Sequence, residues 1–354
     1  MKYISNYVVL WILLLLSSVL PIRNVQAAGT GTLSFSSNPR SPDLYLVDST
    51  NQNLRRLVTD NINKGSPTWS PDGRFFAYVS NHDGDSDIYI MDVRNKASRQ
   101  LTNHPDRDLS PEWSPNGKWI AFVSDRAGDL DIYRIDVDGS NLRRLTKSGN
   151  NKYPAWSPDS QWIAFISSRN EKKSLYIMNA DGNRVRQLGD ASFTWGGCTW
   201  SPDGTQIAFS AWDPEVEGIN IFIVNADGKN IRHLTREKAR DLPFAPKVPI
   251  AYRPAWSPDG HCLAYTLEYL PIPKPGDPQN PEIQQDKKRI FPLVPRDGVI
   301  YITNALDEGG WRLFSITEEL ATDLSPVWVP ETFFSVSPQP QLLITVWGEV
   351  KQEN

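Results

Sequence analysis

The chain reads SPEWSPNGKWIAFVSDRAGDLDIYRIDVDGSNLRRLT at residues 110–146, and most of the remaining sequence consists of copies of this stretch. Its signature, Trp-Ser-Pro, recurs at steps of 44, 43, 44 and 56 residues. A degenerate copy, Trp-Val-Pro, begins at Trp328. Repetition at such a period marks an array of one supersecondary unit. We number repeats two to six by their signature tryptophans, which are Trp69, Trp113, Trp156, Trp200 and Trp256.

Two further patterns recur in the same register. An aliphatic-aromatic pair is followed three residues later by Asp or Asn six times, from Tyr45 with Asp48 to Tyr301 with Asn304. An Arg stands two residues before a Leu five times, at Arg55, Arg99, Arg143, Arg186 and Arg232. These arginines fall on the predicted outermost strand, where charges discourage edge-to-edge pairing of sheets.

Each repeat is predicted to contain four short strands. In repeat three these are 111–114, 119–124, 131–136 and 142–146, and the pairs Asn116-Gly117 and Asp138-Gly139 form tight hairpin turns between them. The turn-forming role extends to Asp72, Asp159, Asp203 and Asp259. A four-stranded sheet of about 40 residues cannot bury both faces alone, whereas copies arranged around an axis can, which predicts a β-propeller.

The two ends of the chain are predicted to complete one blade. Residues 32–59 lack a first strand, and residues 325–330 supply one, so together they form repeat one. The predicted fold is therefore all-β: a six-bladed β-propeller of four-stranded antiparallel blades, its ring closed by the N- and C-terminal strands. It forms a single domain over residues 28–354, and we expect it to be a monomer.

Residues 1–27 have the pattern of a signal peptide. Lys2 precedes an apolar core at 8–20, and Val25-Gln26-Ala27 is a small-residue cleavage motif, which predicts a periplasmic or secreted protein. The alternative is an uncleaved N-terminal anchor; after cleavage no transmembrane span is expected. Removing Lys2 and Arg23 with the leader changes the net charge from −4 to about −6, which argues against nucleic-acid or anionic-membrane partners.

Two insertions interrupt the repeats. The first, 236–253, lies between repeats five and six, and the second, 267–297 within repeat six, contains seven prolines from Pro271 to Pro295. Such a proline-rich segment is predicted to be a long loop rather than an extra strand. In four-stranded blades both insertions emerge on the face of the loops that follow second strands, which we call the insertion-bearing face. Variable loops on a rigid scaffold usually carry function.

The repeat resembles the TolB-type, WD-repeat-like propeller repeat in its Trp-Ser-Pro-Asp-Gly, Ile-Ala-Phe, Asp-Ile-Tyr and Arg-x-Leu-Thr segments, from about residue 32 to 330. The resemblance implies a six-bladed propeller that binds a protein at its mouth. TolB carries an α/β domain ahead of its propeller; here the repeats begin directly after the leader, so that domain is not expected. Related propellers cap prolyl-oligopeptidase-like peptidases, and one branch forms pectin-degrading lyases.

Catalysis is not predicted. The sequence has no Gly-x-Ser-x-Gly nucleophile motif and only four histidines, too few for a lyase-like metal site. We therefore expect no catalytic residues, no cofactor and no metal site. A loose calcium site involving Asp83, Asp85 or Asp129 is the remaining alternative.

Candidate binding residues come from departures between repeats. Arg126 and Arg169 occupy matching positions and favour a structural ion pair, whereas His82 and Trp212 stand at the equivalent places in repeats two and five. Aromatic and Arg residues on exposed loops suit recognition, although the same residues could pack under the insertions. The predicted partner-binding residues are Trp212, Tyr252, Arg253, Trp195, Phe244, Tyr269 and His82.

The two cysteines, Cys198 and Cys262, leave two interpretations open. An exported protein permits a disulfide between them, and otherwise both are small buried hydrophobic residues.

The favoured function is a non-catalytic scaffold at the cell envelope that binds a protein or peptide on the insertion-bearing face. One alternative is a carbohydrate-active or metal-dependent lyase-like enzyme. Another is a propeller subunit of an envelope transport or Tol-type assembly.

Overall fold

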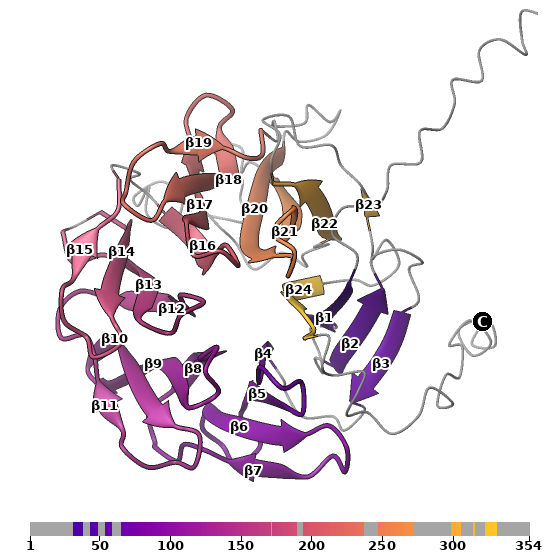
Figure 1. Ribbon diagram of the computed structural model, residues 1–354, viewed down its shortest axis with the longest axis vertical. Coiled ribbons are helices and arrows are strands. Elements are labelled where there is room, and N and C mark those ends of the chain that lie inside the picture. Colours follow the sequence, from indigo (N-terminus) through magenta and orange to yellow (C-terminus); the bar gives the residue numbers. More distant parts are fainter. Residues whose placement is uncertain are drawn as a thin grey trace, which may run out of the picture.

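A computed structural model of the chain describes residues 31–37, 43–48, 54–58, 65–170, 172–189, 194–236, 247–271, 299–305, 314–315 and 323–330. All the regular structure in these residues is β-strand. Among them we find no helix with the length and apolar character needed to cross a membrane. Figure 1 shows the sheets arranged around a central axis, with β8, β12 and β16 innermost and β7, β11 and β15 at the rim.

Repeats two, three and four each form one four-stranded antiparallel sheet, in which the strands lie side by side in chain order. The strands of repeat two are β4 (Gly65–Trp69), β5 (Phe75–Ser80), β6 (Asp87–Asp92) and β7 (Ser98–Gln100). Those of repeat three are β8 (Asp108–Trp113), β9 (Trp119–Ala127), β10 (Asp129–Asp136) and β11 (Arg143–Arg144). Those of repeat four are β12 (Asn151–Trp156), β13 (Trp162–Ser167), β14 (Ser174–Asn179) and β15 (Arg186–Gln187).

Repeats five and six share one eight-stranded sheet. Repeat five contributes β16 (Thr194–Trp200), β17 (Gln206–Asp213), β18 (Gly218–Asn225) and β19 (Arg232–His233). Repeat six contributes β20 (Lys247–Trp256), β21 (Cys262–Pro271), β22 (Val299–Asn304) and β23 (Phe314–Ser315). The two halves are joined by a single parallel pairing between β18 and β20, at Ile219 and Ile250.

The first sheet combines the two ends of the described chain. Its strands are β1 (Thr32–Ser37), β2 (Asp43–Asp48), β3 (Leu54–Val58) and, paired antiparallel with β1, β24 (Asp323–Trp328). The indole of Trp328 donates a hydrogen bond to the carbonyl of Ala255 in repeat six, at 3.0 Å. Leu33 and Phe35 of β1 pack in one cluster with Ile300 of repeat six. The predicted pairing of N- and C-terminal segments is therefore present, and this sheet packs against repeat six.

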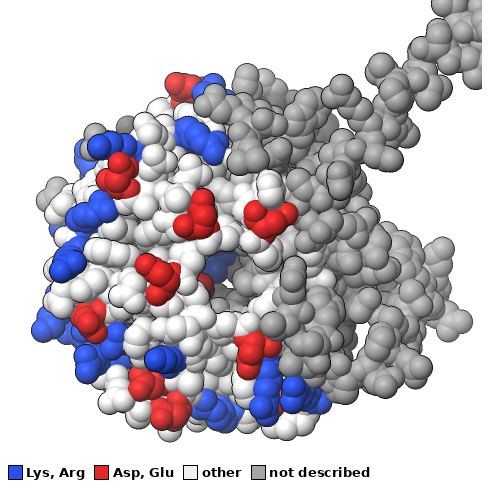
Figure 2. All heavy atoms as spheres, in the orientation of Figure 1, with Lys and Arg blue, Asp and Glu red and all other residues white. Residues whose placement is uncertain are grey.

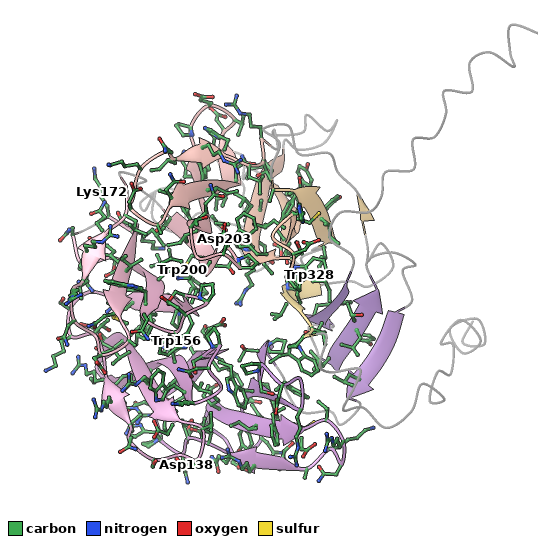
Figure 3. All side chains as sticks on the ribbon, in the orientation of Figure 1. Asp138, Trp156, Lys172, Trp200, Asp203 and Trp328 are labelled. Atoms are coloured by element: carbon green, nitrogen blue, oxygen red, sulfur yellow. The ribbon has the colours of Figure 1, made fainter. Side chains whose placement is uncertain are left out.

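The signature tryptophans hold neighbouring repeats together. The indole of Trp156 donates to the carbonyl of Glu112 at 3.2 Å, and the indole of Trp200 donates to that of Ala155 at 3.1 Å. Figure 3 shows Trp156, Trp200 and Trp328 in the inner part of the ring, while Lys172 lies at the rim. A large apolar ring with one donor suits an interface between sheets, because it fills space and satisfies a backbone carbonyl.

The turns with Asp-Gly have the predicted structural role. In repeat five Ser201 Oγ donates to Asp203 Oδ1 at 2.6 Å, and the same oxygen accepts the Thr205 backbone N–H at 3.0 Å. These hydrogen bonds lower the pKa of the Asp203 carboxyl. Gly204 has a φ of 71°, which glycine adopts without strain. The carboxylates of Asp72, Asp159 and Asp259 accept equivalent bonds.

The recurrent arginines have a different role from the predicted one. They lie on outer strands, but their guanidinium groups bind the next repeat instead of only deterring edge pairing. Arg99 donates to the carbonyl of Val137, Arg186 to that of Ala226 at 2.8 Å, and Arg232 to that of Ala305 at 2.8 Å. The short outer strands thus link the sheets at the rim.

The predicted start of the inner strand of repeat three was wrong. The first strand of repeat three begins at Asp108 and not at residue 111, because a β-bulge lets pairing continue past a register shift. The residue three before the signature Trp has positive φ in repeats three, four and six, at Ser110 (50°), Tyr153 (55°) and Arg253 (53°), and repeat five has Gly197 there. The bulge therefore recurs in successive repeats.

Candidate functional site

Two matching positions occur in repeats three and four, at the end of the sheet on the insertion-bearing face, and repeats five and six have a similar pair that lies one residue earlier along the second strand. The first lies on the inner strand, opposite the Ser or Thr near the end of the second strand, and the second lies two residues after that Ser or Thr. We call them the pair positions. They are Asp108 with Arg126, Asn151 with Arg169, Trp195 with Trp212, and Tyr252 with Glu268.

In repeat three the pair positions form a closed ion pair. The Asp108 side chain is 0% exposed, and Arg126 Nη2 donates to both of its carboxylate oxygens, at 2.9 and 2.8 Å. The Arg126 guanidinium also lies over the Tyr133 ring, 5.1 Å from its centroid. The predicted structural ion pair is confirmed for Arg126, and its charge is consumed within the sheet.

Repeats four and six also close their pair positions with polar contacts. Arg169 Nη2 donates to Asn151 Oδ1 at 3.3 Å, so its partner is an amide and not a carboxylate. In repeat six the Tyr252 hydroxyl donates to Glu268 Oε1, and both residues are buried. Tyr252 was predicted to lie in an exposed segment before the strand; it lies inside β20 instead, because β20 extends back to Lys247.

Repeat five is different, because both of its pair positions are tryptophans. Trp195 lies in β16 with its backbone opposite Ser210. Trp212 is 39% exposed, and among the described residues it is the one aromatic side chain in the set of exposed large hydrophobic residues. An apolar ring therefore faces solvent one residue before the position of Arg126, which Asp213 takes in repeat five.

In repeat two the corresponding position carries His82, and its side chain is 66% exposed with Nε2 3.8 Å from Asp83 Oδ1. Of the remaining predicted binding residues, Tyr269 packs against the buried cluster between repeats five and six. Phe244 lies outside the described residues. The structure thus brings Trp212 and Tyr269 to the same pair of repeats, whereas His82 belongs to a separate one.

Repeats five and six extend beyond the other sheets at this end. β20 and β21 pair over ten residues each, from Lys247 opposite Pro271 down to Trp256. The sequence predicted loops over the first part of this extension and over residues 267–271, and both predictions were wrong. Ile219 and Ile250 pack with the Tyr252 ring into a small buried cluster. The extension is therefore a rigid support directly beside Trp212.

Arg253 lies toward the centre of the ring and not on an outer loop. Its guanidinium lies 5.6 Å from the centroid of the Tyr153 ring, which belongs to repeat four. Gly196 of repeat five lets the neighbouring part of β20 lie close, since a Cβ on Gly196 would come within 2.6 Å of Tyr252 Cβ. Figure 2 shows one face of the ring, hollowed at its centre, with acidic residues around the hollow and basic residues more frequent toward the rim.

Glu112 adds a titratable group to the inner strand of repeat three. Burial raises the pKa of its carboxyl to about 8. The pKa of the Cys198 thiol is raised, mainly because the thiol is buried and secondly because of its electrostatic interaction with Glu112. Cys198 and Cys262 are not joined by a disulfide, and they lie in different hydrophobic clusters. The interpretation as small buried hydrophobic residues is the one that agrees with the structure.

One group of possible metal ligands occurs among the described residues, and the sequence analysis did not predict it. Asp213 at the end of β17, Glu215 in the following turn and His233 in β19 each offer a ligand atom, and these atoms lie within 4.8 Å of one another. Asp213 and His233 are 20 residues apart in the chain, and only the pairing of β18 with β17 and β19 brings them together. Asp83, Asp85 and Asp129 do not form such a group in the described part of the chain.

Comparison with known proteins follows the fold. Solved structures that are similar include TolB from Acinetobacter baumannii, with 20% identity and a TM-score of 0.62 over 85% of this chain and 67% of that chain. Putative TolB from Agrobacterium tumefaciens has 18% identity and a TM-score of 0.58 over 85% of this chain and 92% of that one.

An oligogalacturonate lyase in complex with manganese has 16% identity and a TM-score of 0.50 over 84% of this chain and 75% of that one. At these identities the likeness concerns the fold alone. No curated protein matches the chain. The family model of the TolB beta propeller domain matches residues 32–153 and 153–279, which is more than half of the sequence. This chain belongs to the TolB beta propeller domain family.

Proposed function

We propose that this protein is a non-catalytic propeller that binds a protein or peptide partner on its insertion-bearing face. The observation that carries the proposal is the exposed ring of Trp212 near the end of β17, beside the extended strands of repeat six. Exposed tryptophans on rigid supports are the residues most often found to dominate protein interfaces.

The architecture that goes with this function is a closed ring of six blades. The proposal counts the eight-stranded sheet as two blades, because β18 and β20 share one pairing only. Closure is supported by the pairing of β24 with β1 and by the Trp328 bond to repeat six. The proposal includes export by the leader at residues 1–27, a single domain over 28–354, a periplasmic or secreted location, and a monomer.

Trp212 is the proposed anchor, and its neighbours have supporting roles. The partly buried Arg253 and the packed ring of Tyr269 flank the extension of repeats five and six, and Tyr252 braces it from inside through Glu268. A partner that covers Trp212 gains by removing its apolar ring from water, and the preordered strands lose little conformational freedom on binding.

The test compares capture of envelope proteins by three immobilised proteins. These are the wild type, Trp212→Ala, and Lys229→Glu as the control. Lys229 lies in the β18–β19 turn at the opposite end of the sheet, and its side chain is 79% exposed. Truncation of an anchor costs about 2 kcal/mol or more, which is about a thirtyfold loss of affinity. We expect Trp212→Ala to lose the captured partner and Lys229→Glu to keep it; the reverse pattern would assign the other face.

A second candidate, a metal-dependent carbohydrate-active enzyme, is favoured by the group of Asp213, Glu215 and His233. One imidazole and two carboxylates leave coordination positions open for water or substrate. The test is release of unsaturated products from polygalacturonate with and without added Mn²⁺. If the wild type releases product and Asp213→Asn does not, the enzyme hypothesis replaces the binding proposal.

A further inference from the structure

Two buried polar atoms in repeat five face each other without a hydrogen bond. Asp213 Oδ2 and His233 Nδ1 are 3.1 Å apart, and the Asp213 side chain is 1% exposed. Neither atom has a hydrogen-bond partner among the described residues. The other carboxylate oxygen of Asp213 accepts the backbone N–H of Glu215 at 3.0 Å. Leaving a buried carboxylate oxygen unsatisfied is costly, so this arrangement favours a third group between the two atoms.

Repeats two and four engage a polar side chain of the corresponding loop with a tyrosine. In repeat two the Tyr89 hydroxyl donates to Asp83 Oδ2 at 2.6 Å, and in repeat four the Tyr176 hydroxyl accepts from Asn170 at 2.9 Å. Repeat five has Phe222 at the tyrosine position, which removes that hydroxyl. The His233 ring packs 4.5 Å from the Phe222 ring and presents Nδ1 to the carboxylate instead. Repeat five therefore lacks the tyrosine hydroxyl of repeats two and four, and an imidazole faces its carboxylate.

The spacing of these atoms matches that of two ligands on one metal ion. Bonds of 2.0–2.2 Å from a divalent ion to an imidazole nitrogen and a carboxylate oxygen place the two ligand atoms about 3.0–3.4 Å apart. When Nδ1 carries a lone pair, it and Asp213 Oδ2 are both acceptors, and a cation between them satisfies both. The Glu215 side chain is exposed and can rotate, so it can complete the set from the turn.

We infer that Asp213, Glu215 and His233 form a binding site for a divalent transition-metal ion of the Zn²⁺ class. One imidazole with two carboxylates suits Zn²⁺ better than Ca²⁺, which takes six to eight oxygen ligands. The ion ties the β17–β18 turn to the outer strand β19, one residue from Trp212. The inference stands independently of the proposed partner, because it rests on the ligand atoms alone.

The experiment is a calorimetric titration of the metal-stripped full chain with Zn²⁺ and, separately, with Ca²⁺. The variants are Asp213→Asn, His233→Gln and Glu215→Gln. The matched control is His261→Gln, because His261 Nδ1 also faces a carboxylate, Asp259 Oδ2 at 3.4 Å, but in an exposed pair.

We expect the wild type to bind one Zn²⁺ per chain and to bind Ca²⁺ more weakly. The affinity for Zn²⁺ should be at least about tenfold lower in Asp213→Asn and His233→Gln, because removal of groups that only support metal ligands already costs that much. Glu215→Gln lies on the surface and so tests the site even if a buried variant does not fold. His261→Gln should bind like the wild type. Absence of saturable Zn²⁺ binding by the wild type, or equal loss in His261→Gln, overturns the inference and leaves an ion pair of Asp213 with protonated His233. Neither result bears on capture of a partner by Trp212.

Discussion

Repeats three and five use the same strands for opposite purposes. In repeat three the pair positions hold the buried carboxylate of Asp108 and the guanidinium of Arg126, which satisfy each other. In repeat five the position of Arg126 is taken by Asp213, and Trp212, one residue before it, faces solvent. A charge that is paired inside a sheet stabilises the scaffold, whereas an exposed apolar ring contributes little to folding and remains available to a partner.

The outer halves of the two repeats differ in the same way. Asp131 in repeat three accepts from Arg144, Thr146 and Asn151. Repeat five has the neutral Asn220 in place of Asp131, and His233 in place of Arg144 turns toward another carboxylate. The charged network of repeat three is internally complete, and that of repeat five leaves a carboxylate oxygen unsatisfied. The comparison suggests that one repeat was specialised while its neighbours kept the scaffold.

The largest effect should come from breaking the closed pair of repeat three. Arg126→Ala leaves the Asp108 carboxylate buried without its counter-charge, which costs about 3–5 kcal/mol of unfolding free energy. Urea unfolding followed by tryptophan fluorescence measures it. The control is Arg107→Ala: Arg107 pairs with Asp125 at 2.6 Å, but its side chain is 60% exposed, so about 0.2–1 kcal/mol is expected. Equal losses in the two variants would contradict the distinction.

A second prediction concerns pH and the inner strands. Burial raises the pKa of Glu112 in repeat three to about 8, whereas repeat five has the neutral Thr199 at the matching position before its signature Trp. The folded state holds a proton on Glu112 that the unfolded chain releases near pH 4.5. Stability is therefore complete below that pH and falls as pH rises to about 8, by at most about 1.4 kcal/mol per pH unit.

Glu112→Gln should remove this fall. The measurement is the urea midpoint of wild type and variant between pH 4.5 and 8. Parallel curves over that interval would show that Glu112 is ionised in the folded protein and that its burial has no cost.

The smallest effect compares one threonine in each repeat. Thr146 Oγ1 donates to the charged Asp131 at 2.7 Å, and Thr235 Oγ1 donates to the neutral Asn220 at 2.9 Å. Hydrogen bonds to charged groups contribute about 1.5–3 kcal/mol and neutral ones about 0.5–1.5. Thr146→Val should therefore destabilise the protein by about 1 kcal/mol more than Thr235→Val, measured by urea unfolding. A larger loss for Thr235→Val would mean that the two networks do not differ as described.

The repeat units could be predicted from the sequence because their signals are local. The hairpin at Asp203-Gly204 needs only a turn that accepts positive φ, and the apolar run from Trp119 fits a strand covered on both faces. The split first repeat could also be predicted, because counting strands shows that 325–330 supplies the one that 32–59 lacks. Each of these features is determined within about 40 residues or by counting.

The extension of repeats five and six could not be predicted in this way. Segments with Pro249 and Pro271 read as loops, yet β20 and β21 pair across them. Proline lacks a backbone donor, but Pro249 is the third residue of β20 and Pro271 the last of β21, so both lie near strand ends. The burial of Tyr252 follows from that pairing, since Glu268 reaches its hydroxyl only when both strands continue. Strand ends are decided by the partner strand and not by the residues of one segment.

The sequence by itself determined the repeated strands, the hairpin turns, the membership of Arg126, Arg169 and His82 in one series of matching positions, and the face on which the insertions emerge; it misplaced Trp212, which lies one residue before that position. Only the tertiary structure decided which members of that series close on a partner and which remain exposed, and it alone brought Asp213 and His233 within 3.1 Å. The reason is physical. Local signals fix backbone conformation over a few residues, whereas contacts between side chains depend on cross-strand register, and each bulge or extended strand shifts that register.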